Sequence, residues 1–176
     1  MVFIQCFLVV IVAVALFVIA RLSWASYKLR NHPSVEPIAV AHPEIAPELN
    51  QLIHDISKAA NLDFSPALFV RRGALPNAFI AAVIIRPELF ISDELLEHCD
   101  TCNNGLEELM RVLCHEIAHL QRHDAIRLGL LTYLEQSSDV LRFKFIERFA
   151  QNKIAHIEKQ TDLAADEIFK KVCASE

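Results

Sequence analysis

The sequence predicts an α+β protein that is mainly helical, with an N-terminal transmembrane helix followed by a domain with a small antiparallel sheet. Three observations support this fold class. Residues 2–20 form an uncharged apolar run, residues 67–92 hold three short β-type runs, and helical apolar patterns lie on both sides of those runs. The order of elements, a helix, a sheet and then further helices, indicates an α+β arrangement.

The apolar run predicts a membrane anchor. Its nineteen residues would span about 28 Å as a helix, which is close to the thickness of a bilayer core. No Lys or Arg precedes the run and no clear small-x-small cleavage site follows it, which favours an anchor over a cleaved signal peptide. Arg21, Lys28 and Arg30 follow, and the positive-inside rule then places the domain in the cytoplasm. We therefore predict a single-pass anchor over residues 1–22 in the cell (inner or plasma) membrane.

Behind the anchor, we predict a juxtamembrane linker over residues 23–43 and one domain over residues 44–176. Four prolines between residues 31 and 47 indicate a stiff, mostly extended linker. All 17 Lys and Arg and all 22 Asp and Glu follow residue 20, which gives a net charge of −5. This mildly acidic balance argues against nucleic-acid binding. The five scattered cysteines suit free thiols in a reducing compartment better than a disulfide framework.

The domain begins with an amphipathic helix over residues 48–60, followed by strands over residues 67–71, 77–85 and 88–92. The middle strand is continuously apolar. A buried central strand explains this most simply, although an edge strand that lines a peptide groove would also be apolar. Ser92 or Asp93 can cap the short helix that follows, because their side-chain oxygens accept hydrogen bonds from free backbone amides.

A further helix starts at Leu106 and contains the sequence His115-Glu116-Ile117-Ala118-His119. Side chains four residues apart lie on one helical face, so both imidazoles can reach the same metal ion. A catalytic zinc takes three protein ligands and leaves a fourth position for water, whose proton Glu116 would remove. This H-E-x-x-H pattern predicts one Zn²⁺ bound by His115 and His119, with Glu116 as general base.

Residues 124–142 are helix-like but too polar for a second membrane span, and we expect a docked or interfacial hairpin there. A last helix is predicted over residues 153–172. Glu158, Asp162 and Asp166 lie on one of its faces at successive i+4 spacing. Three such carboxylates repel one another, and a zinc ion would offset the repulsion.

Longer blocks surround these motifs: Asn77-Ala78-Phe79, Arg86-Pro87-Glu88-Leu89-Phe90-Ile91-Ser92, and Val112-Leu113-Cys114-His115-Glu116-Ile117-Ala118-His119-Leu120-Gln121-Arg122-His123-Asp124. With them the chain resembles the gluzincin membrane peptidases of the HtpX and CAAX-prenyl-protease type. It resembles still more the peptidase domains of BlaR/MecR-type sensors. The resemblance implies a zincin-like domain and a third metal ligand from a later helix, within a Glu-x-x-Ala-Asp pattern.

The stretch that matches this pattern is Asp162-Leu163-Ala164-Ala165-Asp166. The resemblance therefore implies Asp162 as third ligand and Asp166 as the carboxylate that orients a zinc-bound histidine. Asp162 replaces the family's glutamate and is one methylene shorter, so Glu158, one turn earlier, stays open as the alternative ligand.

The resemblance also implies that the strand beginning with Asn77, Ala78 and Phe79 pairs with an extended substrate backbone. A transition-state stabiliser has no evident match, and its unranked candidates are His156, Tyr133, Arg127 and Arg148. The pair Cys99 and Cys102 has C-x-x-C spacing but no second pair, which argues against a redox or metal role.

The sequence thus predicts a membrane-anchored, zinc-dependent metalloendopeptidase that acts on protein or peptide substrates. Its partners would be the lipid bilayer and, as an open alternative, a membrane protein that supplies additional membrane helices. A second hypothesis is a catalytically inactive zinc-binding regulatory or interaction domain. Asp162 and the missing stabiliser favour that hypothesis, whereas the intact Glu116 argues against it.

Overall fold

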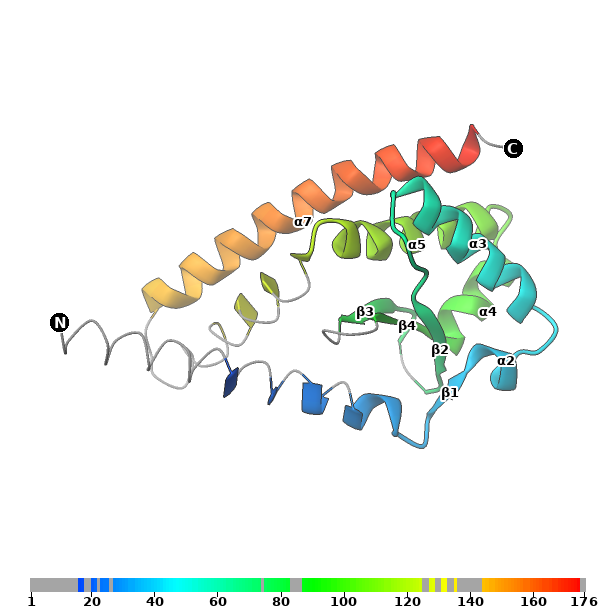
Figure 1. The fold of residues 1–176 in the computed structure, drawn as a ribbon, viewed down its shortest axis with the longest axis horizontal. Helices are drawn as coiled ribbons and strands as arrows, with labels where there is room; N and C mark the ends of the chain where they lie inside the picture. Colours follow the sequence, from blue (N-terminus) through cyan, green and yellow to red (C-terminus); the bar gives the residue numbers. More distant parts are fainter. Residues whose placement is uncertain are drawn as a thin grey trace.

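The computed structural model describes residues 16–17, 20–21, 23–25, 27–73, 75–82, 87–124, 127–128, 131–132, 135 and 144–174. Within these residues the order of elements is β1 (Val35–Pro37), α2 (Ile38–Ala41), α3 (Ala46–Ala59), β2 (Ala67–Arg71), β3 (Ala78–Ala82), β4 (Pro87–Ser92), α4 (Asp93–Thr101), α5 (Gly105–Gln121) and α7 (Lys144–Cys173). A small sheet lies beside α5, and the long helix α7 runs along the other side of α5 (Figure 1). The mainly helical α+β prediction is confirmed.

The sheet is mixed rather than antiparallel, so that part of the prediction is wrong. Its strand order is β1-β2-β4-β3. β1 pairs with β2 and β3 with β4 in antiparallel fashion, but β2 and β4 are parallel. The reason is that β3 and β4 form a hairpin that docks on β2 through its second strand. Short turns between successive strands do not reveal which strand of a hairpin meets the rest of the sheet.

The expectation of a central strand at residues 77–85 is also wrong, because β3 is an edge of the four-stranded sheet that the structure describes. The central strands are β2 and β4. β3 is nevertheless apolar throughout because both of its faces are covered. Ala78 and Ile80 pack against the main core, while Phe79 and Ala81 pack against a second cluster. Residues 83–86 of the predicted strand lie outside the described residues.

The two faces of the sheet bury two different clusters, as the alternation of side chains along a strand requires. The main core joins the sheet to α3, α4, α5 and α7, and it includes the fully buried side chains Ile56, Val70, Leu89, Ile91, Leu113 and Ile117. The second cluster is built on Val35, Phe69 and Phe90. The Phe90 ring stacks between Phe79 and Phe69, with centroid distances of 5.1 and 5.4 Å. α5 is thereby held against the sheet on the main-core side.

Part of the stretch predicted as a linker belongs to the folded body. β1 pairs with the outer edge of β2, and Ile38 of α2 is buried in the main core. Arg30 also contacts the sheet, since its guanidinium lies 3.1 Å from the buried carboxylate of Glu88 in β4. One of the three basic residues that were predicted to flank the membrane therefore forms an ion pair with the domain.

Among the described residues, no helix combines the length and the apolar character needed to cross a bilayer. Most of the predicted anchor, including all of residues 1–15, lies outside the described residues. The same holds for most of the predicted hairpin at residues 124–142. The transmembrane anchor therefore stays a prediction.

The helices agree with the sequence patterns more closely than the sheet does. α3 and α5 cover the predicted amphipathic segments, and α7 extends the last predicted helix toward its N-terminus to Lys144. Ser92 is the N-cap of α4, where its hydroxyl accepts a hydrogen bond from the Leu95 amide at 3.2 Å. Ser92 also accepts one from the Asn77 amide, so the same side chain joins β3 to the start of α4.

Candidate metal centre

α5 forms because its apolar residues recur on one stripe, with Leu109, Leu113 and Ile117 facing the core. It lies between β3 on one side and α7 on the other. The helix ends after Gln121, and His123 follows it with a positive φ of 55°, the left-handed conformation common after helix C-termini. His123 is exposed, and it lies eight residues beyond His115, about 12 Å along a straight helix, which is too far to share one ion.

Three ligand atoms come together where α5 faces α7. The Nε2 atoms of His115 and His119 lie 3.2 Å apart. Glu158 places its Oε2 atom 3.4 Å from the first nitrogen and 3.5 Å from the second. Around a tetrahedral zinc with bonds of about 2.0–2.2 Å, neighbouring ligand atoms are roughly 3.3–3.6 Å apart. The arrangement therefore fits one zinc ion held by two imidazole nitrogens and one carboxylate oxygen.

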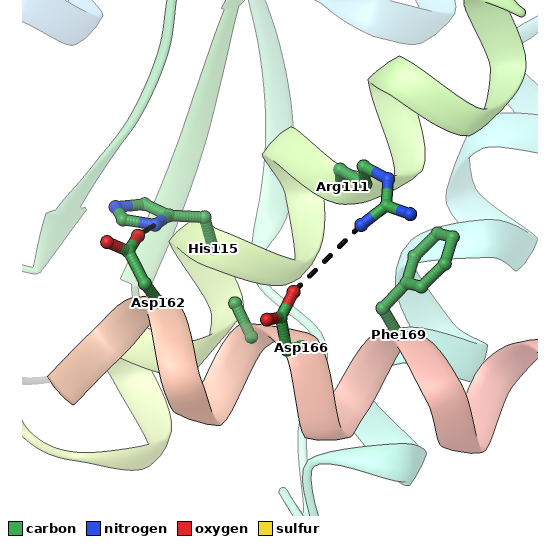
Figure 2. Close-up of a pocket in the computed structure, with 6 residues that line it drawn as sticks. Arg111, His115, Asp162, Asp166 and Phe169 are labelled. Carbon is green, nitrogen blue, oxygen red and sulfur yellow. Dashed lines mark ion pairs between the residues drawn. The ribbon is translucent and has the colours of Figure 1, made fainter. Parts of the chain in front are cut away.

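Asp162 lies on the other side of the His115 ring. Its Oδ1 atom is 3.0 Å from Nδ1 of His115, an ion-pair contact with that ring (Figure 2). It is not a member of the group formed by His115, His119 and Glu158. Of the two predicted alternatives for the third ligand, Glu158 is therefore the one whose carboxylate lies near both Nε2 atoms. One helical turn is about 5.4 Å, and at the crossing of α5 and α7 it is the turn of Glu158 that meets both Nε2 atoms.

Asp166 lies one turn further along α7 and does not contact a histidine. Its Oδ1 atom is 3.9 Å from the Arg111 guanidinium, and its side chain is 63% exposed. In this geometry Asp162, rather than Asp166, lies beside a histidine nitrogen. The orienting role that the resemblance implied for Asp166 stays a prediction.

His119 has a second set of partners that the sequence did not indicate. Nδ1 of His119 is 3.4 Å from the hydroxyl of Thr161, and that hydroxyl is 3.4 Å from Oδ2 of Asp124. Both Thr161 and Asp124 are fully buried, and Arg122 donates to Asp124 at 2.8 Å. A proton on Nδ1 of His119 can be donated to Thr161, which leaves Nε2 free to bind a metal. The only sequence signal for this contact was Asp124 in the block that resembles the sensor peptidases.

Glu116 lies between the metal-ligand group and the edge of the sheet. Its Oε2 atom accepts a hydrogen bond from the Ile80 amide at 3.1 Å. The pKa of Glu116 is raised to about 7, chiefly by burial; the Ile80 hydrogen bond opposes this shift, and the charge of Glu158 adds to it. Burial also lowers the pKa of His119, while the charge of Glu158 opposes this shift. A carboxylate with a pKa near neutrality is suited to both accepting and returning a proton.

The strand residues predicted to contact substrate take different positions. The Asn77 carbonyl accepts a hydrogen bond from the Ser92 amide, and the Asn77 amide donates to the Ser92 hydroxyl, at the start of the β3–β4 ladder. Phe79 is paired with Phe90, and its ring packs in the second cluster. Antiparallel pairing alternates, so the backbone amides of Ala78 and Ile80 point away from β4, toward the free edge. The hydrogen bond from Ile80 to Glu116 shows that this edge faces the catalytic candidate.

A cavity of about 240 Å³ lies on the Asp162 side of His115, between α5 and α7 (Figure 2). It is lined by Arg111, His115, Asp162, Ala165, Asp166 and Phe169. The Arg111 guanidinium is placed over the Phe169 ring at 4.2 Å and beside Glu107 at 3.0 Å. Because this lining includes neither Glu116 nor Glu158, the cavity is not the space in which Glu116 would meet a substrate.

The remaining candidates have contacts elsewhere. His156 contacts Gln160, and Arg127 lies near Asp124. Arg148 is exposed, and Tyr133 lies outside the described residues. Cys99 is buried and Cys102 is not, so the two thiols of the C-x-x-C pair do not share one environment.

Two histidines one turn apart with a glutamate between them, completed by a carboxylate from another helix, are the donor set of the H-E-x-x-H metal-dependent hydrolases. The model of Peptidase family M48 matches residues 43–169, and the chain belongs to this family. It is accordingly a peptidase of the metal-dependent class. No match was found among curated proteins or among solved structures.

Proposed function

We propose that the chain is a membrane-anchored zinc metalloendopeptidase in which Glu116 is the general base. The proposal rests on one observation: His115, His119 and Glu158 bring three ligand atoms within 4.8 Å of one another, with Glu116 beside them. Zinc bound there would polarise a peptide carbonyl and activate a water molecule. The donor set supports zinc because imidazole and carboxylate are ligands that catalytic zinc commonly takes.

The surrounding residues would orient the ligands and manage the proton. Asp162 would hold the His115 ring through Nδ1, and Thr161 would hold the His119 ring in the same way. Glu116 would accept a proton from the attacking water and return it to the leaving amine. Its raised pKa supports this exchange at neutral pH.

The free edge of β3 would receive the substrate. An extended peptide can add to an exposed strand edge through backbone hydrogen bonds, and Ala78 and Ile80 present such groups. The Ile80 amide donates to Glu116 in the free protein. A substrate backbone that pairs with β3 would lie within reach of the same carboxylate, which supports cleavage within an extended protein segment.

The membrane setting of the proposal comes from the N-terminal sequence. Residues 2–20 have no charge, and basic residues follow them. We propose a single-pass protein of the cell membrane with its catalytic domain in the cytoplasm. Protein or peptide substrates, the bilayer and a partner membrane protein remain the proposed partners. The narrower relation to HtpX, CAAX-prenyl-protease or BlaR/MecR-type proteins is part of this proposal.

The inactive alternative is not favoured. Its main support was that Asp162 is too short for a third ligand, and Glu158 removes that difficulty because it lies near both histidines. Glu116 is also partly buried beside the ligand group, a placement that a purely structural metal site would not need.

The decisive experiment combines zinc analysis with proteolysis of casein by the full-length protein and its Glu116→Gln variant. We expect both proteins to bind zinc at the His115 site, because Glu116 is not a ligand. Activity of the variant should fall by about 10²–10⁴-fold, the usual contribution of a general base. Bound zinc with equal cleavage by the two proteins, or with no cleavage by either, would contradict the proposal.

A further inference from the structure

A second group of metal-ligating side chains lies at the junction of α4 and α5, on residues that the proposed function does not use. His98 is in the last turn of α4, Cys102 follows the end of that helix, and Glu108 is in the first turn of α5. Their ligand atoms all lie within 4.8 Å of one another. The group contains one imidazole nitrogen, one thiol sulfur and one carboxylate oxygen, each of which is a zinc ligand.

The distances match those around a tetrahedral zinc ion. Nε2 of His98 is 3.7 Å from Sγ of Cys102 and 3.6 Å from Oε1 of Glu108. With a Zn–S bond of about 2.3 Å and Zn–N and Zn–O bonds of about 2.1 Å, the expected separations are roughly 3.6 Å and 3.4 Å. The three side chains therefore need only small movements to bind one ion.

The backbone at this junction holds α4 and α5 close together. The Gly105 amide donates to the Cys102 carbonyl, which closes the tight turn between the two helices. A Cβ atom at Gly105 would come within 1.5 Å of the Cys99 carbonyl oxygen. Only glycine permits this approach. The end of α4 with His98 and the start of α5 with Glu108 are therefore close together before any metal binds.

Simple electrostatics explains only part of the group. A cation is favoured in the last turn of a helix and an anion in the first turn, which accounts for His98 and Glu108 without a metal. It does not account for the Cys102 thiol beside the same imidazole nitrogen. Cys99, the other half of the C-x-x-C pair, is buried in the main core. Its position gives no reason for the Cys102 thiol to lie beside the His98 imidazole.

We propose that His98, Cys102 and Glu108 form a second zinc site, with water as the fourth ligand. The site does not depend on the proposed function, because it shares no residue with the group at His115. About half of the His98 and Glu108 side-chain surface is exposed, and Cys102 is partly exposed. The ion would therefore exchange more readily than one at His115, where the histidines are less exposed. It would connect α4 to the start of the helix that holds the first site.

Cobalt substitution tests this site separately from the first one. A Co²⁺ ion with a thiolate ligand has a strong near-ultraviolet charge-transfer band, and the His115, His119 and Glu158 group contains no sulfur. We expect the full-length protein to bind two Co²⁺ ions and to show the band. Cys102→Ser and His98→Ala should each lose the band and one ion.

The controls are chosen from the same chain. Cys173→Ser removes an exposed thiol outside the group and His54→Ala removes an exposed histidine, so both should keep the band and both ions. Glu158→Gln should abolish stoichiometric binding at the first site and leave the band intact. Circular dichroism checks that each variant is folded.

Absence of the band in the full-length protein would overturn the proposal, and so would its persistence in folded Cys102→Ser. If Cys102→Ser retains proteolytic activity while losing the band, the second site exists and is not required for catalysis. If the band is present but casein is not cleaved, the second site stands and the proposed function fails.

Discussion

At the scale of single residues, three carboxylates on successive turns of α7 face three different partners. Glu158 faces the Nε2 atoms of both histidines, Asp162 faces Nδ1 of His115, and Asp166 faces Arg111. A carboxylate on the unliganded nitrogen of a histidine orients the ring and makes it a better ligand. Replacing these residues one at a time should therefore distinguish a residue that binds zinc from a residue that orients a histidine ligand.

We predict that Glu158→Gln abolishes stoichiometric zinc binding at the first site, whereas Asp162→Asn lowers zinc affinity by about 10–100-fold, the range found for residues that orient a ligand. Asp166→Asn is the matched control on the same helix and should leave affinity unchanged, since Asp166 contacts only Arg111 among the described residues. Competition titration with a chromogenic chelator measures the zinc affinity of all three variants. Each variant also carries Cys102→Ser, so that the proposed second site does not contribute. Equal losses for Asp162→Asn and Asp166→Asn would contradict the assignment.

At the scale of elements, α5 positions the site because it is held on three sides. It contacts β3, α7 and α4, and its N-terminus approaches α4 closely at Gly105. Among the described strands β3 is at the edge of the sheet, its side chains pack on both faces, and its Ile80 amide donates to Glu116. The element that would receive the substrate is thus fixed against the element that would hold the metal.

We predict that Gly105→Ala destabilises the protein by about 1–3 kcal/mol or more, because the added Cβ would meet the Cys99 carbonyl oxygen at 1.5 Å and the two helices would have to separate. Gly73→Ala is the contrasting variant. Gly73 has a φ of +69° but open space around it, so it should cost only about 1 kcal/mol of backbone strain. Urea unfolding compares the two, and a smaller loss for Gly105→Ala would show that the junction is not closely packed.

At the scale of the whole molecule, the candidate metal site joins the middle of the domain to its C-terminal helix. The histidines are on α5, while Glu158 comes from the C-terminal helix α7. The carboxylates of Glu158, Asp162 and Asp166 on α7 would repel one another without a cation nearby. A ligand that binds only the folded state stabilises it in proportion to the logarithm of its concentration over its Kd. Zinc should therefore stabilise the entire domain and not only the site.

We predict that removal of zinc with a chelator lowers the Tm by about 5–10 °C, which corresponds to roughly 2–3 kcal/mol at a zinc concentration of about 100 Kd. Added zinc should restore the original Tm. The Cys102→Ser variant should show most of this shift, because it retains the first site, while a Cys102→Ser, Glu158→Gln double variant should show none. Differential scanning fluorimetry measures the effect, and a chelator shift that persists in the double variant would place the stabilising ion elsewhere.

The local features of this protein can be predicted from its sequence alone. Apolar spacing located α3 and α5, the runs at residues 67–71 and 88–92 located β2 and β4, and the i+4 spacing put His115 and His119 on one helical face. Of the two predicted caps, Ser92 and Asp93, the structure has Ser92. Each of these depends on residues within a few positions of one another, where the backbone geometry is known in advance.

Two features could be seen only in the tertiary structure, because they depend on contacts between distant elements: the position of β3 in the sheet and the positions of the α7 carboxylates relative to α5. The place of β3 at the sheet edge depends on which strand of the β3–β4 hairpin docks on β2. The roles of Glu158 and Asp162 depend on the register of α7 against α5, and both carboxylates satisfy the same i+4 pattern. A shift of one turn, about 5.4 Å along the axis, exchanges ligand and orienting residue without changing the helical periodicity. The packing of the two helices is the physical reason why Glu158, and not Asp162, lies near both Nε2 atoms.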